Sequence, residues 1–246
     1  LNDVKAFFKK HYCPANAVLV VAGPVKTEDV RMMAEKWFGE IPAGDKYDRR
    51  LPQEPAQTET RRLVVEADVP LDALYMCWHM PARMEPGYQA VDMLTDILGS
   101  GASSRLHQSL VKEQKLFSNV ECYHFGSTDR GLLTIEGKLV TGVTLEAAES
   151  AVQKEIDQLL TNGVTEDELQ KAKNKTESMI AFEDMSVMNR ATSLAHYELL
   201  GDADMMNTEF ARYAAVTIKD VLVQAEQIFR MENLNVMYYR SKPEAV

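Results

Sequence analysis

The sequence has little cysteine: only Cys13, Cys77 and Cys122, at long spacing. An odd number at such distances is neither a disulfide framework nor a C-x-x-C zinc site. We expect three small, partly buried thiols. So few cysteines weakly favour the reducing cytoplasm, without excluding the periplasm. No apolar run approaches the roughly 20 residues of a membrane-spanning helix, so a soluble protein is expected.

Positive charge is also in the minority. The chain has 27 Lys and Arg residues against 37 Asp and Glu, a net charge of −10. An acidic chain lacks the field that attracts nucleic acid or anionic membranes, so neither is an expected partner. Apolar residues are 46% and charged residues 26% of the 246, which excludes a disordered or low-complexity chain.

The common catalytic motifs are absent. No two of the five histidines are four residues apart, so neither H-E-x-x-H nor H-x-x-E-H occurs. There is no G-x-S-x-G for a serine nucleophile, and no local signature supports a Cys–His nucleophilic pair. Cys122 and His124 share one face of a predicted strand, where a metal pair and ordinary packing both stay open.

A Gly/Ser loop from Gly99 to Ser104 is the most distinctive local feature. It lacks the P-loop lysine and follows a predicted helix, which favours a helix–helix connection over a phosphate loop. Arg105 comes next, in the first turn of a helix, where the helix dipole does not favour a cation. We therefore expect Arg105 either to pair with a carboxylate or to face a cleft.

Residues 1–41 predict a helix, a strand and a second helix. Asn2 is the expected cap of the first helix, the apolar run Ala17–Ala22 is the expected buried strand, and Thr27 is the expected cap of a helix that Gly39 ends. Such a unit cannot bury its own apolar stripes. Because the chain also starts at Leu1 within a helix pattern, we expect an excised fragment whose first 41 residues complete a preceding domain.

Residues 42–62 contain three prolines and mixed charges and predict a linker, and residues 63–246 predict one α+β domain. Strands are expected at 63–69, 73–80, 117–125, 132–140 and 234–239, and helices from Gly87, from Ser104 and at 144–160, 165–180, 187–200 and 218–229. This order is not a β-α-β alternation. It predicts a mainly antiparallel sheet with helices packed on one face.

Several stretches resemble the pitrilysin-type zinc metallopeptidases, the insulinase-like or inverzincin family. The opening VKAFFKKHYCPANAVLVVAGPV, followed by AEKWFGEIP, is similar to a hallmark of that family. MLTDILGSGASSRLHQSLVKEQKLFSNV resembles its non-catalytic second-domain motif, in which a Gly/Ser loop precedes Ser-Arg-Leu. VTEDELQKAKN and ATSLAHYELLGD match its later helices, so the resemblance covers essentially the whole chain.

The resemblance implies a catalytically inert C-terminal part of a zinc endopeptidase, which forms one wall of a peptide-binding chamber. Ser103, Ser104 and Arg105 are the candidates to line that chamber. In the family, an H-x-x-E-H helix and a downstream Glu hold zinc, all upstream of where this chain begins. No catalytic, cofactor-binding or metal-binding residue is therefore expected in this fragment, and zinc is expected in the parent protein, which would hydrolyse peptides with zinc-activated water.

The resemblance also implies partners: the upstream catalytic domain of the same chain, a second family subunit or a homodimer, and a peptide substrate. The family's non-catalytic half often carries an Arg and a Tyr seven residues apart, which assist substrate binding. Two alignments place Val111 and Ser118, or Leu110 and Phe117, at those positions, so the pair is missing. Its absence motivates a second hypothesis, a structural or assembly subunit without peptidase activity; an unrelated α+β binding module is a third.

Overall fold

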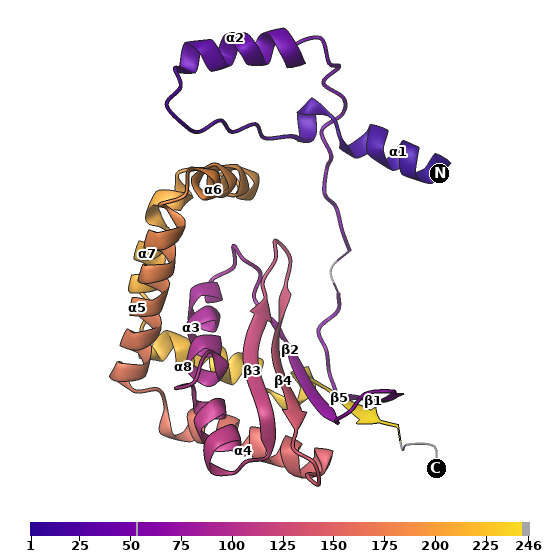
Figure 1. Ribbon diagram of the computed structural model, residues 1–246, viewed down its shortest axis with the longest axis vertical. Coiled ribbons are helices and arrows are strands. Elements are labelled where there is room, and N and C mark those ends of the chain that lie inside the picture. The colour runs from indigo at the N-terminus through magenta and orange to yellow at the C-terminus, as the bar shows by residue number, and fades with distance from the viewer. Residues whose placement is uncertain (53, 243–246) are drawn as a thin grey trace. The chain divides into compact units, whose positions relative to one another are not determined.

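The computed structural model describes residues 1–52 and 54–242, and the chain divides into two compact units (Figure 1). Unit 1 comprises Leu1–Pro55 and Glu177–Phe210, and unit 2 comprises Ala56–Thr176 and Ala211–Val246. No helix within the described residues is both long and apolar enough to cross a membrane.

Unit 2 is built on a five-stranded sheet with the strand order β1-β5-β2-β4-β3. The strands are β1 Arg61–Ala67, β2 Ala73–Met80, β3 Phe117–Phe125, β4 Gly131–Leu139 and β5 Leu234–Ser241. The β2–β4, β2–β5 and β3–β4 pairs are antiparallel, and the β1–β5 pair at one edge is parallel. The predicted α+β class with a mainly antiparallel sheet is therefore confirmed.

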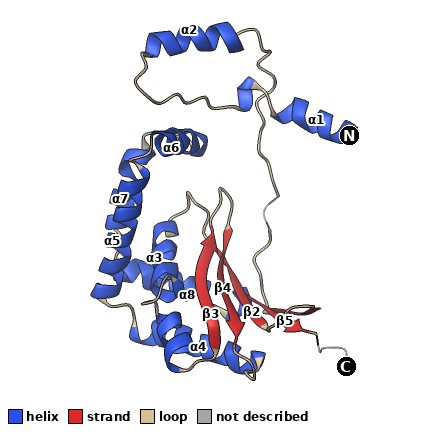
Figure 2. Cartoon of the chain, in the orientation of Figure 1, coloured by secondary structure: helices blue, strands red, loops and turns tan. Residues whose placement is uncertain are grey.

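Three helices lie against one face of this sheet: α3 Tyr88–Gly99, α4 Leu145–Asn162 and α8 Ile218–Ile228 (Figure 2). Alternate residues of β2 point toward them, because successive side chains of a strand face opposite sides. Leu74, Met76, Trp78 and Met80 are at most 2% exposed. The Trp78 ring packs edge-on against the Phe229 ring, with centroids 5.0 Å apart. This contact forms part of the core between the sheet and the helices.

Local capping signals correctly predict where two helices, α5 Glu166–Glu183 and α8, begin. α5 begins after Thr165, whose hydroxyl accepts from the Glu168 N–H. α8 begins with a full capping box between Thr217 and Asp220. The helix predicted from Ser104 is present as η2 His107–Glu113, but as a π-helix, and η3 Met231–Asn233 is a short 3₁₀ turn before β5.

Unit 1 contains α1 Asn2–His11, η1 Pro14–Asn16, α2 Thr27–Phe38 and α6 Val187–Leu200. The prediction of a strand at Ala17–Ala22 is wrong: these residues join no sheet within residues 1–52 and 54–242, because a strand needs a hydrogen-bonding neighbour. The expected caps Asn2 and Thr27 are also wrong, since both lie inside their helices and the N-caps are Leu1 and Lys26. Gly39 ends α2 as expected.

One helix was not predicted. α7 Met205–Ala214 follows the Gly201–Asp204 segment, whose composition resembles a loop, although Met206, Phe210 and Tyr213 recur at helical spacing within it. Tyr213 near its end is 7% exposed and donates a hydrogen bond to Asp92 of α3 at 2.7 Å. This tertiary contact stabilises the end of α7.

Candidate functional site

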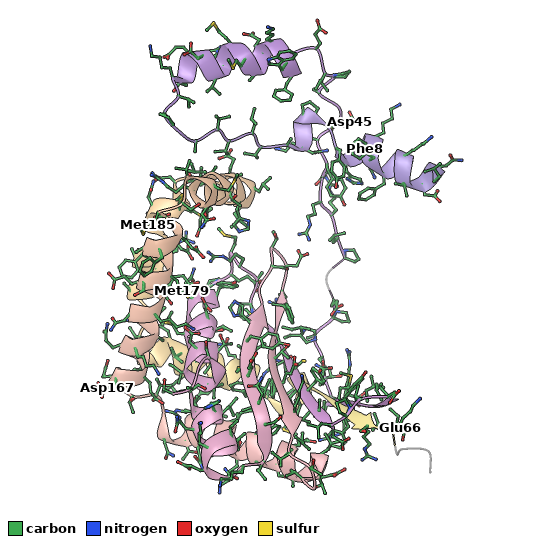
Figure 3. All side chains as sticks on the ribbon, viewed as in Figure 1. Phe8, Asp45, Glu66, Asp167, Met179 and Met185 are labelled. Atoms are coloured by element: carbon green, nitrogen blue, oxygen red, sulfur yellow. The ribbon has the colours of Figure 1, made fainter. Side chains whose placement is uncertain are left out.

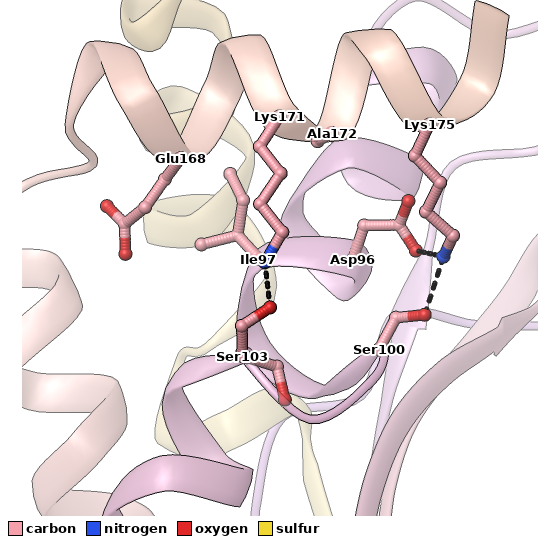
Figure 4. Close-up of a pocket in the computed structure, with 9 residues that line it drawn as sticks. Asp96, Ile97, Ser100, Ser103, Glu168, Lys171, Ala172 and Lys175 are labelled. Atoms are coloured by element: carbon pink, nitrogen blue, oxygen red, sulfur yellow. Dashed lines mark hydrogen bonds and ion pairs between the residues drawn. The ribbon is translucent and has the colours of Figure 1, made fainter. Parts of the chain in front are cut away.

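The loop between α3 and η2 is held against α5 by lysines from α5. The Lys175 Nζ atom lies 2.7 Å from Asp96 Oδ1 and 2.6 Å from Ser100 Oγ, and Lys171 Nζ donates to Ser103 Oγ (Figure 4). Both lysines thus contact the loop one helical turn apart, because residues four apart share a helix face. The loop connects two helices, as predicted, and is fixed rather than free.

Arg105 adds a third and stronger contact. Its Nε lies 2.6 Å from Glu168 Oε1, and its Nη2 lies 2.7 Å from Oε2 and also donates to the Gly163 carbonyl at 2.8 Å. A bidentate guanidinium–carboxylate pair is among the strongest polar contacts in proteins. Arg105 and the N–H and hydroxyl of Thr165 hold the pKa of Glu168 at about 2. Of the two alternatives for Arg105, pairing with a carboxylate is therefore observed.

A hollow opens between this loop and α5, with an empty volume of about 350 Å³ that is partly open to solvent (Figure 4). Ser103 lines it with an exposed side chain, whereas Ser104 is 2% exposed and donates to the Gly101 carbonyl at 2.7 Å. The three candidate residues thus differ. Ser103 is accessible, while Ser104 and Arg105 make contacts that stabilise the loop.

The sheet face opposite α3, α4 and α8 carries half-exposed polar and aromatic side chains. Tyr75, Cys77 and His79 alternate with the core residues of β2, and Tyr75 lies across from Glu136 in the β2–β4 register. The Tyr123 hydroxyl donates to Glu136 Oε2 at 2.7 Å. Burial, and then the Glu136 charge, raise the pKa of both tyrosines, so both rings keep their hydroxyl protons at neutral pH. We call this surface the open sheet face.

The Cys122–His124 pair predicted as a metal site or as packing is found in ordinary packing. Cys122 is 3% exposed, and a Cβ at Gly99 of α3 would collide with it, so helix and strand are in close contact there. His124 Nε2 lies 3.0 Å from the Tyr88 hydroxyl, and its Nδ1 lies 3.6 Å from Asp92 Oδ1. Sequence reasoning missed these helix partners because neither is adjacent to β3 in the chain.

The His, Cys, Asp and Glu side chains of the described residues do not form a donor set that fits zinc. Within residues 1–52 and 54–242, no group of three or more His, Cys, Asp or Glu side chains is arranged to hold a metal ion. Burial strongly raises the pKa of Cys122, which keeps the thiol protonated, whereas zinc binds the thiolate. All three cysteines are unpaired thiols, with Cys13 and Cys77 half-buried.

The two alternative alignments assign the Arg–Tyr positions to residues without that chemistry. Leu110 and Phe117 are core residues, 0% and 2% exposed. In the other alignment, Val111 is half-buried and Ser118 donates to the Lys138 carbonyl at 3.1 Å. Neither alignment therefore gives this chain a cation and a phenol aimed at a substrate.

A family model and several curated proteins match this chain. The family model described as the peptidase M16 inactive domain matches residues 1–176. The chain is 25% identical over 233 residues to the zinc protease PqqE of Helicobacter pylori, covering 94% of this chain and 52% of that protein. It spans about half the length of the curated relatives it matches.

Two crystal structures share the fold. A protease from Helicobacter pylori superposes with a TM-score of 0.89 at 23% identity, covering 98% of this chain and 59% of that one. A peptidase M16 inactive domain from Pseudomonas fluorescens superposes with a TM-score of 0.82 at 21% identity, covering 100% of this chain and 58% of that one.

Proposed function

Because the chain belongs to the family of peptidase M16 inactive domains, we propose that it forms one wall of a peptide-binding chamber in a zinc-dependent endopeptidase. The observation that carries this proposal is the open sheet face. It presents Tyr75 and Tyr123 half-exposed, each with an apolar ring and a polar hydroxyl. Such amphipathic rings suit contact with an extended peptide.

We also propose that residues 1–41 complete an upstream catalytic domain, that 42–62 link it to the inert domain, and that 63–246 form that domain. The support is the exposure of the N-terminal apolar stripes. Phe8 of α1 is 59% exposed and Trp37 of α2 is 67% exposed, and neither helix has a buried residue (Figure 3 labels Phe8). Side chains of this size are normally buried, which favours an additional folding partner. The upstream half would supply the zinc ligands and the catalytic residues.

Within the chamber, Ser103 is the proposed lining residue of the α3–η2 loop. Arg105 and Ser104 would hold the loop in place through Glu168 and the Gly101 carbonyl. The missing Arg–Tyr pair would come from a second family subunit or from another part of the parent chain, since Leu110 and Phe117 are buried here.

The test uses the full-length parent protein. Its upstream sequence should contain H-x-x-E-H, and it should cleave an unstructured peptide in a reaction that a chelator abolishes. Tyr75→Ala on the open sheet face should raise KM about fivefold, equivalent to about 1 kcal/mol of lost contact, with kcat little changed. Tyr238→Phe is the matched control, because this tyrosine faces α4 and donates to Glu149 at 2.6 Å. Equal KM values for the two variants would refute the proposal that the open sheet face forms one wall of the chamber.

A second candidate function is favoured by the buried Leu110 and Phe117. Without the Arg–Tyr pair, the parent could serve as a structural or assembly subunit of the same family, with no peptidase activity. That hypothesis expects no cleavage by the full-length protein with any co-expressed family partner. Chelator-sensitive cleavage would eliminate it.

A further inference from the structure

We infer that a second hollow in unit 2, where the first turn of α3 meets α7 and α8, binds the C-terminal carboxylate of a peptide. It is lined by Gly87, Gln89 and Ala90 at the start of α3, by Arg212 of α7, and by Asp220, Val223 and Gln224 of α8. Its empty volume is about 690 Å³, including space open to solvent. It shares no lining residue with the hollow at Ser103.

The α3 end of this hollow favours an anion. The first N–H groups of a helix have no acceptor within the helix and carry the positive end of its dipole. α3 begins after Gly87, which caps it with no side-chain hydrogen bond, and its first turn contains no acidic residue. Arg212 brings a guanidinium to the same hollow and has no ion-pair partner in the part of the chain that the structure describes.

A buried amide is the independent sign of a ligand. Gln224 is 9% exposed, and its Oε1 atom is buried with no hydrogen-bond partner among the described residues. This amide lies against Gly87, because a Cβ there would collide with its Cδ and Nε2 atoms. A buried polar atom without a partner costs about 1–3 kcal/mol, so an acceptor left in this state favours a donor from a bound molecule.

A peptide C-terminus satisfies both ends of the hollow. Its carboxylate would accept from the α3 first-turn N–H groups and from Arg212, and the N–H of its last residue would donate to Gln224 Oε1. Val223 and Val216 give the last side chain an apolar surface, which favours an apolar C-terminal residue. The choice of a peptide rests on the proposed function, whereas the requirement for a carboxylate rests on the hollow alone.

One charge opposes the anion. Asp220 is the single carboxylate among the lining residues, and its Oδ2 accepts from the Thr217 N–H at 2.9 Å and hydroxyl at 2.6 Å. Those bonds lower its pKa, so it stays ionised at neutral pH. Asp220→Asn should keep an oxygen for the capping box and remove the repulsion, which makes it a gain-of-affinity variant.

The test measures binding of a fluorescein-labelled hexapeptide ending in valine to this chain by fluorescence anisotropy. The free acid should bind about tenfold more tightly than the same peptide with a C-terminal amide. Arg212→Gln should weaken binding of the acid about tenfold and leave the amide unchanged, and Asp220→Asn should strengthen binding of the acid. Arg190→Gln, an exposed arginine of α6 in unit 1, is the matched control and should change neither.

Three results would overturn the inference: equal affinities for acid and amide, no effect of Arg212→Gln beyond that of Arg190→Gln, or inorganic phosphate displacing the peptide as well as the unlabelled free acid does. The third result would indicate a general oxyanion site. A folded Arg212→Gln variant is verified by an unchanged circular dichroism spectrum. Because the assay involves no cleavage, its failure leaves the chelator test of the parent protein unaffected.

Discussion

Replacing Arg105 by methionine removes the guanidinium that joins the α3–η2 loop to α5. The long, unbranched methionine side chain still occupies the space of the aliphatic part of the arginine. Glu168 has its pKa lowered from 4.5 to about 2 by this guanidinium and by the Thr165 cap. A tenfold change in proton affinity corresponds to about 1.4 kcal/mol, so the lowered pKa of Glu168 contributes at most about 3 kcal/mol to the free energy of unfolding. The Arg105 and Glu168 side chains keep 21% and 29% of their surfaces exposed, so water screens part of this. We expect Arg105→Met to lower the free energy of unfolding by about 2 kcal/mol at pH 7.

The pH dependence follows from the direction of the pKa change. Glu168 binds a proton less readily in the folded than in the unfolded chain, so its contribution is fully present above about pH 4.5. It is lost as the pH falls from 4.5 toward 2, because the unfolded chain then takes up a proton that the folded chain refuses. The difference between wild type and Arg105→Met should therefore shrink over that interval.

The measurement is urea unfolding followed by Trp78 fluorescence in a Trp37→Phe background. Trp78 is 1% exposed in the core of unit 2, whereas Trp37 is 67% exposed in unit 1, so the remaining signal reports on unit 2. Arg130→Met is the control, because Arg130 is 72% exposed and lies 3.4 Å from Glu85; its expected cost is below about 0.5 kcal/mol. Equal losses for the two variants, or a loss for Arg105→Met that is unchanged at pH 3, would refute the reasoning.

Three further predictions use the same Trp78 unfolding assay. Leu94→Ala should cost about 2–5 kcal/mol, because Leu94 is 0% exposed in the core and its truncation leaves a cavity; a cost below about 1 kcal/mol would contradict that packing. Thr217→Val should cost about 1 kcal/mol through loss of the α8 capping box, and Thr217→Ser should restore most of it. Phe8→Ser should leave the Trp78 transition of this chain unchanged, because Phe8 is exposed here. The same substitution should lower the melting temperature of the full-length parent. Destabilisation of this chain without destabilisation of the parent would argue against an upstream partner for α1.

Local sequence patterns were sufficient for much of unit 2. β2 and β3 have the predicted bounds because alternating apolar residues and nearby turn signals are local information. The Thr165–Glu168 and Thr217–Asp220 spacings also located the helix starts, since capping involves residues three apart. In unit 1, the helical spacing of apolar residues predicted α6 at its observed bounds.

The misses arise where the deciding contact is distant in sequence. The apolar run Ala17–Ala22 has strand composition, but no strand in the described residues pairs with it, and a ladder cannot be inferred from one strand. Arg105 could be recognised as an unusual cation, yet its partner Glu168 is 63 residues away. The hollow at Gln224 depends on Gly87 and α8 approaching each other, and no motif in the sequence indicates that approach.

The β1–β5 ladder has a consequence for the order in which the sheet can be assembled during synthesis. β1 is the first strand of unit 2 to leave the ribosome, yet its hydrogen-bonding neighbour is β5, the last, with Arg61 paired to Asn235. Until β5 emerges, β1 has no neighbour in the sheet, and its apolar residues Leu63, Val64 and Val65 lie in an unpaired segment of the kind that promotes aggregation. A nascent chain that stalls before Leu234 therefore leaves the backbone N–H and C=O groups of β1 without the partners that β5 provides.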